Sequence, residues 1–237
     1  MKKLLEGKRA LILGVANEKS IAWGIARAFK AQGANIALTY LNDQLKKRVV
    51  PLSEEIEADW IHEMDVTVDD HYGSLKEKLE KEWGKFDILV HSLAFANRDD
   101  LRADFSDTSR DGFKMACDIS AFSLIGLCHH LKPLMSDNSS VLAMTYYGST
   151  KVLEGYNVMG VAKAALEASA RYLAADLGRN GIRVNCISAG PIRTLAASGV
   201  KSIKKAFEFI DERSPMRKNV TTEDVGGTAV YLASDLS

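Results

Sequence analysis

The sequence predicts a single doubly wound α/β domain, with one parallel sheet and helices on both of its faces. Short apolar segments alternate with longer segments of helical periodicity along the whole chain of 237 residues. Successive strands are separated by stretches long enough for a crossover helix, which requires a parallel sheet covered on both faces. No linker, repeat or low-complexity segment interrupts the alternation, so we expect one domain over residues 1–237.

The predicted strands are short runs of mainly aliphatic residues, and amphipathic patterns fill the intervals between them. The strands are expected at residues 9–13, 35–39, 60–62, 86–91, 141–145 and 183–188. The helices are expected at about residues 20–32, 43–57, 69–83, 110–131, 157–177, 202–212 and 222–233. The last helix opens with a threonine at its cap and acidic residues in its first turn, as a helix N-terminus favours.

Composition and charge narrow the class of protein. Thirty-one basic residues balance thirty-one acidic ones, which argues against the broad positive surface of a nucleic-acid or membrane-surface protein. The N-terminus lacks an apolar signal region, and no apolar run reaches the ~18 residues of a membrane span. Cys117, Cys128 and Cys186 form no CxxC pair and are expected to be free thiols, and the histidines show no metal-ligand spacing. We expect a cytoplasmic protein with no metal site, nucleic-acid partner or integral membrane segment.

Functional residues are expected directly after the strands, because open parallel sheets bind ligands at the carboxyl ends of their strands. Gly14 follows the first strand and permits a tight turn. Ser20 and Ile21 open the next helix, whose N–H groups are suited to a pyrophosphate. The pattern is not GxGxxG, so a plain glycine turn with Ser20 as an ordinary helix cap is the alternative.

The residues after the second and third strands bear on the choice of dinucleotide. No arginine stands at or next to Leu41 to bind a 2′-phosphate, which favours NADH over NADPH, although Lys46 and Lys47 lie nearby. Asp65 and Val66 follow the third strand and are suited to the amino group and ring of an adenine. Asp65 is equally typical of a turn.

The most informative pair is Tyr156 and Lys163. A spacing of seven residues is nearly two helical turns, so both side chains share one face ~10 Å apart. The lysine is suited to a nicotinamide ribose, and the tyrosine to a substrate oxygen that gains negative charge. Small neighbours such as Gly160 and Ala162 favour close packing of this face. For the bare spacing, an exposed lysine and a core tyrosine are the alternative.

Four segments resemble motifs of the enoyl-[acyl-carrier-protein] reductases, the triclosan-target family of the short-chain dehydrogenase/reductase superfamily. They are GVANEKSIAWGIA, DISAFS, YNVMGVAK and RVNCISAGPIRTLAASG, within a resemblance that runs from about residue 7 to 237. Met159 stands where other members of the superfamily have a tyrosine four residues before the lysine, which argues against a carbonyl reductase. A non-catalytic nucleotide-sensing module is the rival from another class, and such a module would be expected to lack Tyr156 or Lys163.

The resemblance implies a Rossmann fold and the reduction of trans-2-enoyl thioesters on acyl carrier protein by NADH, the last step of each bacterial fatty acid elongation cycle. It implies that Tyr146, Tyr156 and Lys163 are catalytic, that the two tyrosines bind substrate, and that Lys163 binds the nicotinamide ribose. Ala96 would contact the substrate or a triclosan-type inhibitor. The implied cofactor-binding residues are Gly14, Ser20, Ile21, Leu41, Asp65, Val66, Ser92, Leu93, Lys163, Ile192, Arg193, Thr194, Leu195 and Ala196.

The resemblance also implies features beyond the site. A mobile substrate-binding lid is expected at about residues 195–212, and a homotetramer is the expected assembly. Members of the family continue past the position of Ser237 with a turn and a final strand, so we expect the sheet of this chain to lack that strand.

Overall fold

A computed structural model describes residues 3–199 and 203–237 and confirms the predicted α/β fold. The described residues form one sheet of six parallel strands in the order β3-β2-β1-β4-β5-β6. The order reverses between β1 and β4, which is where doubly wound sheets bind their ligands. The strands are β1 (Arg9–Leu13), β2 (Asn35–Tyr40), β3 (Trp60–Glu63), β4 (Phe86–His91), β5 (Met135–Thr145) and β6 (Arg183–Ser188).

The helices and strands lie close to the predicted positions, with three main differences. The predicted helix 110–131 contains a π-helical turn, α4 was not predicted, and β5 begins at Met135 rather than at residue 141. The α-helices are α1 (Ile21–Ala31), α2 (Asp43–Glu55), α3 (Asp69–Glu82), α4 (Arg98–Arg102), α5 (Arg110–Cys117), α6 (Ser123–Leu131), α7 (Asn157–Leu177), α8 (Ile203–Arg213) and α9 (Thr222–Ala233). The short turns are η1 (Phe105–Asp107), the π-helical η2 (Asp118–Phe122), η3 (Lys132–Leu134), η4 (Tyr147–Ser149), η5 (Gly178–Asn180) and η6 (Ala197–Gly199).

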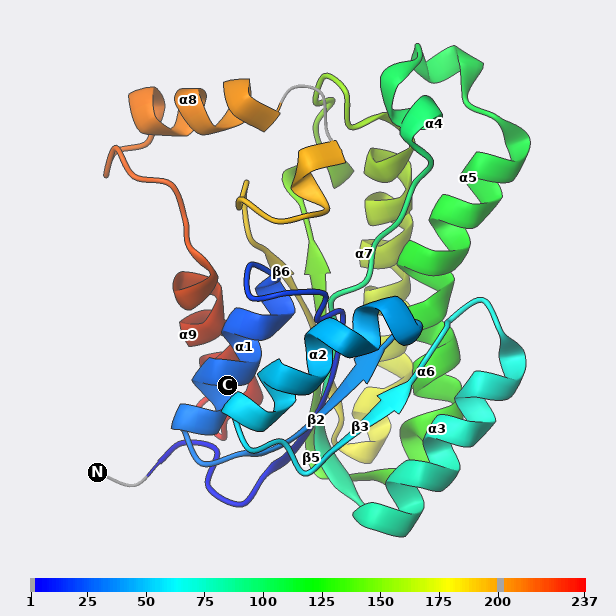
Figure 1. Ribbon diagram of the computed structural model, residues 1–237, viewed down its shortest axis with the longest axis vertical. Helices are drawn as coiled ribbons and strands as arrows, with labels where there is room; N and C mark the ends of the chain where they lie inside the picture. Colours follow the sequence, from blue (N-terminus) through cyan, green and yellow to red (C-terminus); the bar gives the residue numbers. More distant parts are fainter. Residues whose placement is uncertain (1–2, 200–202) are drawn as a thin grey trace.

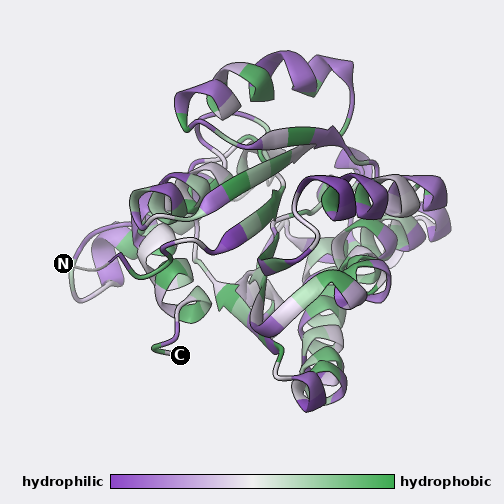
Figure 2. Cartoon of the chain, turned by 90° about the horizontal axis from the view of Figure 1, so that it is seen from below, coloured by the Kyte–Doolittle hydropathy of each residue, from purple (hydrophilic) through white to green (hydrophobic). Residues whose placement is uncertain are grey.

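The sheet separates two apolar cores, and alternate residues of each strand face opposite sides. In β1, Ala10 and Ile12 pack with α1, α2 and α9, whereas Leu11 and Leu13 pack with α3, α6 and α7. Figure 1 shows these two groups of helices on either side of the strands, and Figure 2 shows the hydrophobic residues concentrated between them. The sheet is therefore covered on both faces, as the apolar strands predicted.

Helices α1 and α9 approach each other closely through two glycines. A Cβ atom on Gly226 would lie 2.8 Å from the Cβ of Ala28 and 2.9 Å from the carbonyl oxygen of Gly24. A Cβ on Gly24 would lie 2.6 Å from the Cβ of Thr222, at the start of α9. Thr221 caps α9 through a reciprocal pair of hydrogen bonds with Asp224, which confirms the predicted threonine cap.

The described residues also bear on the expectations about thiols, metal sites, membrane segments and the lid. All three cysteines are free, and burial raises the pKa of the Cys128 thiol to about 12. Within residues 3–199 and 203–237, no group of His, Cys, Asp or Glu is arranged to hold a metal ion. None of the described helices combines the length and apolar character that a membrane crossing requires. Of the predicted lid, residues 200–202 lie outside the described residues, as does the predicted first residue of the helix 202–212.

The glycine contact between α1 and α9 gives a stability prediction. Gly226→Ala should destabilise the fold by about 1–2 kcal/mol, because overpacking against backbone exceeds the gain in helix propensity. Gly227→Ala, in the same helix with nothing within 4 Å of the added methyl, should stabilise by up to about 1 kcal/mol. Urea unfolding of both variants measures the difference, and equal effects would show that the close contact does not limit the packing.

Candidate active site

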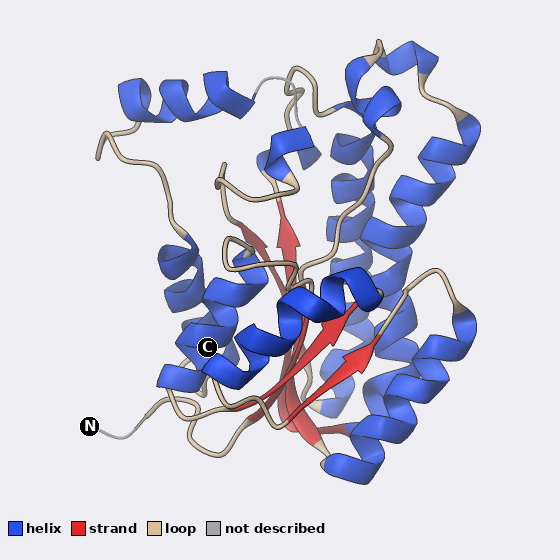
Figure 3. Ribbon diagram, in the orientation of Figure 1, coloured by secondary structure: helices blue, strands red, loops and turns tan. Residues whose placement is uncertain are grey.

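The predicted site residues gather at the carboxyl ends of the strands, where Gly14 directly follows β1 and lies beside Ser92, which directly follows β4. Figure 3 shows the strand arrowheads pointing toward this end of the domain. Gly14 has a φ of 104°, and a Cβ there would lie 2.1 Å from the carbonyl oxygen of Ser92. Only glycine satisfies both constraints. The tight turn at Gly14 against Ser92, called here the Gly14 cradle, is followed by the N-terminus of α1. Together they fit the pyrophosphate of a dinucleotide.

Ser20 occupies the N-cap position of α1, and its side chain stabilises the loop between β1 and α1. Its hydroxyl oxygen accepts hydrogen bonds from the backbone N–H groups of Ala16 at 3.0 Å and Asn17 at 3.1 Å. It makes no side-chain bond to the first turn of α1, which begins at Ile21. Its side-chain contacts therefore differ from those of an ordinary helix cap, and the cofactor role of Ser20 stays a prediction.

The residues expected near the adenosine occupy the neighbouring strand ends. Leu41, 43% exposed, follows β2 directly. The Asp65 carboxylate accepts hydrogen bonds from the Thr67 N–H at 2.9 Å and the Thr67 hydroxyl at 2.7 Å, so it stabilises a turn. Val66 is buried, and its carbonyl accepts a hydrogen bond from the Tyr72 hydroxyl. An adenine contact of Asp65 and Val66 stays a prediction.

Lys163 is buried on α7 beneath the ends of two strands. Its ammonium donates to the carbonyl oxygen of Met144 at 2.7 Å and, at a longer 3.5 Å, to that of Leu93. Burial lowers the pKa of Lys163 to about 8, while Cys186 and Glu167 act in the opposite direction. The amine thus remains mainly protonated at pH 7, and α7 is tied through it to both β4 and β5.

Tyr146 and Tyr156 face each other on either side of the β5–α7 connection. Their ring centroids lie 5.1 Å apart at an interplanar angle of 75°, the edge-to-face arrangement favoured by aromatic pairs. Burial raises the pKa of both phenols, and for Tyr156 the neighbouring Tyr146 raises it further. Both hydroxyls therefore keep their protons at neutral pH and are able to donate a hydrogen bond.

Gly148 allows the Tyr156 ring to lie against the backbone. A Cβ on Gly148 would lie within 2.3 Å of the ring, so any side chain there would displace the phenol. The same connection is held by Glu167 of α7, whose carboxylate accepts from the Thr145 hydroxyl at 2.7 Å and the Ser149 hydroxyl at 2.6 Å. Sequence reasoning assigned no role to Gly148 or Glu167. The signal for Glu167 was its position one helical turn after Lys163.

The loop after β4 is held by the π-helical turn. The Ser120 hydroxyl accepts from the N–H of Phe95 at 3.1 Å. His91, at the end of β4, is fully buried and lies 2.7 Å from the Ser123 hydroxyl oxygen through its Nε2 atom. Burial and, to a smaller extent, nearby Lys163 lower the pKa of His91 to about 3, so the imidazole is neutral. These contacts fix the backbone between β4 and the predicted substrate residue Ala96.

Ala96 and Tyr156 pack against the same apolar cluster. The cluster joins α4, α5 and the first turns of α7, and it therefore provides an apolar wall beside the phenol. Its buried members are Leu101, Ala116, Val158, Met159 and Ala162. Tyr146 packs on Tyr156, which shares this cluster with Ala96, and Lys163 follows Tyr156 on α7; their roles stay predictions.

The segment Ile192–Ala196 follows β6 and leads toward α8. Ile192 is buried, the Thr194 hydroxyl oxygen accepts from the N–H of Ala197 at 3.0 Å, and Leu195 is 53% exposed. The Arg193 guanidinium lies 4.5 Å from the centroid of the Phe207 ring in α8, a cation–π contact. This segment therefore connects the site to the helix of the predicted lid.

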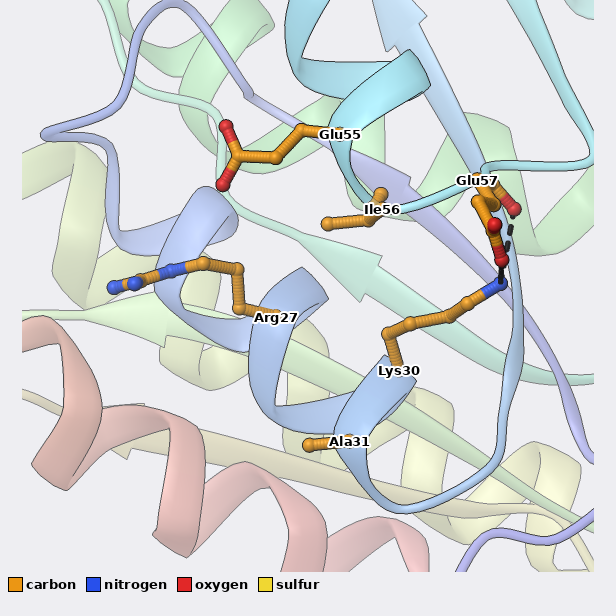
Figure 4. A pocket seen from close by; sticks show the side chains of 6 residues that line it. All are labelled: Arg27, Lys30, Ala31, Glu55, Ile56 and Glu57. Carbon is orange, nitrogen blue, oxygen red and sulfur yellow. Dashed lines mark hydrogen bonds and ion pairs between the residues drawn. The ribbon is translucent and has the colours of Figure 1, made fainter.

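A surface depression elsewhere carries none of the predicted residues. It lies between α1 and the end of α2, and in Figure 4 the Lys30 ammonium reaches Glu57, donating to its carbonyl oxygen at 2.9 Å. Its lining is mostly charged, with Arg27 and Glu55 at its edge. It lies at the opposite end of α1 from the Gly14 loop, so it is not part of this site.

The Gly14 cradle at the switch point, beside a tyrosine and a buried lysine on a crossover helix, defines a nicotinamide-dependent short-chain dehydrogenase/reductase. A family model described as enoyl-(acyl carrier protein) reductase matches residues 14–237. The chain belongs to this family.

Similar proteins carry the same description. The enoyl-[acyl-carrier-protein] reductase [NADH] 1 of Rhizobium meliloti (strain 1021) is 50% identical over 234 residues, covering 99% of this chain and 86% of that protein. The reductase of Nostoc sp. is 50% identical over 236 residues, covering 98% and 92%. These similarities confirm the predicted family, the enzyme class and the NADH-dependent type.

Solved structures agree with the fold. The crystal structure of the NADH enoyl reductase of Aquifex aeolicus VF5 superposes with a TM-score of 0.94 at 49% identity, covering 98% of this chain and 91% of that one. The Bacillus cereus reductase, solved with NADP+ and an indole naphthyridinone, gives 0.96 at 48% identity, covering 99% and 92%. The Anaplasma phagocytophilum reductase, solved with NAD, gives 0.94 at 45%, covering 100% and 88%.

The buried ammonium of Lys163 gives a prediction for stability against pH. Because its pKa is lowered from 10.5 to about 8, the unfolded chain binds more protons than the folded one between these values, and stability should rise with pH there. Relative to Lys163→Met, the wild type should gain up to about 3 kcal/mol between pH 7 and 10.5. Urea unfolding across this range, with the exposed Lys81→Met as a comparison, measures it. A difference independent of pH would contradict the assignment.

Proposed function

We propose that this chain reduces trans-2-enoyl thioesters on acyl carrier protein with NADH, in the last step of each bacterial fatty acid elongation cycle. The observation that carries the proposal is the placement of Tyr156 and Tyr146 edge to face, at the strand ends where Lys163 is buried. Membership of the enoyl reductase family and the names of relatives support the same activity.

Tyr156 stabilises the charge that develops on the substrate. When bound, NADH supplies a hydride to the β-carbon of the enoyl group, and negative charge then accumulates on the thioester oxygen. The Tyr156 hydroxyl donates a hydrogen bond to that oxygen, which is typically worth about 3 kcal/mol in the transition state. The raised pKa of Tyr156 keeps the proton on this donor. A proton added to the α-carbon completes the saturated product.

Lys163 and Tyr146 prepare the site for this step. An ammonium has three donors. Two of those of Lys163 are directed at the carbonyls of Met144 and Leu93, which leaves a third for the nicotinamide ribose. Tyr146 packs its ring against Tyr156 and orients the phenol while adding a second hydroxyl near the thioester. The cofactor role of Ser92, Leu93 and the segment Ile192–Ala196 follows from their place at the strand ends.

Two substitutions separate the roles of the tyrosine and the lysine. Tyr156→Phe should lower kcat by about 100-fold with little change in the KM for NADH, because only the donor to the substrate oxygen is lost. Lys163→Ala should raise the KM for NADH first, because the lysine contacts the cofactor. Steady-state kinetics measures both. If both variants kept wild-type turnover and differed only in melting temperature, the catalytic assignment would be wrong.

The assay of the wild type tests the activity and the cofactor together. NADH oxidation should depend on an enoyl thioester such as crotonyl-CoA, and kcat/KM should be higher with NADH than with NADPH. The reason is that neither Leu41 nor Asn42, directly after β2, supplies an arginine for a 2′-phosphate. Lys46 and Lys47, in the first turns of α2, are the cations that would permit the opposite result. Equal or better efficiency with NADPH would overturn the preference.

The predicted homotetramer has support from apolar side chains on the outer faces of α5, η2, α6 and α7. Phe113, Phe122, Ile125, Val161 and Tyr172 are all at least one-third exposed, an unusual amount of apolar surface for helices of a monomer. Light scattering should give the mass of four copies, and Phe122→Lys should lower it. Phe209→Lys, at a phenylalanine on α8 that is also more than half exposed, should leave it unchanged. A monomeric wild type would exclude the tetramer.

Further proposals concern partners and location. The acyl carrier protein delivers the substrate, and triclosan-type inhibitors would bind beside Tyr156 near Ala96. The three free thiols, Cys117, Cys128 and Cys186, are the state expected in a reducing compartment, which supports the cytoplasmic location.

A further inference from the structure

Tyr156 lies between two residues whose backbone is left-handed. Gly155 has a φ of 74° and Asn157 a φ of 40°, whereas Tyr156 itself has an ordinary φ of −96°. Glycine adopts such angles without strain, and asparagine tolerates them better than most side chains. A non-glycine residue in this region costs of order 1 kcal/mol and persists only where surrounding contacts hold it. The contacts of Asn157 are therefore informative.

The Asn157 side chain is bound to the end of α4. Its Nδ2 atom donates to the carbonyl oxygen of Ala103 at 2.7 Å, and it lies 3.4 Å and 3.5 Å from the carbonyl oxygens of Leu101 and Asp100. The last carbonyls of a helix have no partner within that helix. The Asn157 side chain thus supplies a hydrogen-bond donor to the carbonyl oxygens at the C-terminal end of α4. Asn157 is also the residue that directly follows Tyr156.

Helix α4 is itself fixed, which makes it a firm anchor. The buried Asp100 carboxylate accepts from the Ser109 N–H at 2.7 Å and from the Ser109 hydroxyl at 3.2 Å. Ser109 also caps α5, because its hydroxyl oxygen accepts from the Gly112 N–H at 3.0 Å. Leu101 packs with Val158 of α7 in the buried apolar cluster. The turn that carries Tyr156 is therefore attached to the α4–α5 unit.

We propose that Asn157 is a positioning residue for Tyr156, holding the phenol where it meets the substrate oxygen. The proposal rests on the function proposed for Tyr156 above. Asparagine combines tolerance of the left-handed backbone with an N–H donor directed at the end of α4. Glycine would supply only the backbone angle, aspartate would place an acceptor against carbonyl oxygens, and alanine would supply neither.

Substitutions of Asn157 test whether the backbone angle and the side-chain donor are both needed. Asn157→Gly should lower kcat by about threefold, and Asn157→Ala and Asn157→Asp by at least about tenfold, with the KM for NADH changed by less than about twofold. Asn138 provides the matched control, because it is an exposed asparagine with a φ of 62° in the first half of β5. Asn138→Ala should shift the melting temperature and leave kcat unchanged.

Two further measurements distinguish positioning from a general loss of stability. In the Tyr156→Phe background, Asn157→Ala should lower kcat by less than about twofold, since its effect acts through the phenol. With tyrosine labelled at 13Cζ, the resonance that Tyr156→Phe removes should shift in Asn157→Gly and Asn157→Ala but not in Asn138→Ala.

The outcomes are separable. Wild-type turnover in Asn157→Ala, multiplicative losses in the double variant, or an unmoved Tyr156 resonance would each overturn the role of Asn157. Absence of enoyl-thioester-dependent NADH oxidation by the wild type would instead overturn the proposed function, and the resonance would still decide whether Asn157 positions the phenol. Should Asn157→Ala fail to fold, Asn157→Gly carries the same test, because it retains the backbone angle.

Discussion

The burial of the Lys163 ammonium is the constraint on which the site depends. A charge without solvent must be held by hydrogen-bond acceptors, and here the acceptors are backbone carbonyls at the ends of β4 and β5. The lysine therefore fixes the position of α7 along its axis and its rotation relative to the sheet. Once α7 is placed, its first turns bring Tyr156 to the same edge, and Glu167 one turn later holds the loop that carries Tyr146.

The surroundings of Tyr156 show how a flexible side chain is given one orientation. Gly148 leaves room for the ring, Tyr146 packs against it edge to face, and Gly160 lets α7 approach the backbone of Gly148. The backbone on either side of Tyr156 is left-handed at Gly155 and Asn157. The glycines and the left-handed backbone lower the stability of this region. The two apolar cores that flank the sheet offset this loss. The arrangement agrees with the need to hold catalytic groups on rigid elements supported by their neighbours.

Helix α8 is held much more loosely than α7. Within the described part of α8, Phe207 is the one buried residue, and it contacts Arg193 of the segment after β6. The Asn219 side chain adds a hydrogen bond to the carbonyl oxygen of Phe207 at 3.2 Å. Figure 1 shows α8 standing apart from the two layers of helices. Few buried contacts make a segment easy to move, which agrees with the predicted lid at about residues 195–212.

The sequence by itself determined the layers of the fold and the position of Tyr156 and Lys163, the pair predicted to be catalytic. The strands 9–13, 86–91 and 183–188 and the helix 157–177 were predicted with the bounds observed, because hydrophobic periodicity is a local property of the chain. The spacing of Tyr156 and Lys163 on one helix is local in the same sense. The parallel alternation then required both residues to lie at the carboxyl edge of the sheet.

Only the tertiary structure decided what surrounds that pair. Helix α4 has five residues, which are too few for a periodic pattern. The π-helical turn leaves the apolar period of the predicted helix 110–131 almost unchanged. The contacts of Gly148 with Tyr156, of Ser20 with its own loop and of Asn157 with α4 depend on how segments meet in space. Periodicity reports which face of an element is buried. Periodicity contains no information about which atom of a distant segment will lie against a given residue. Hydrogen bonds and close packing depend on the positions of such individual atoms.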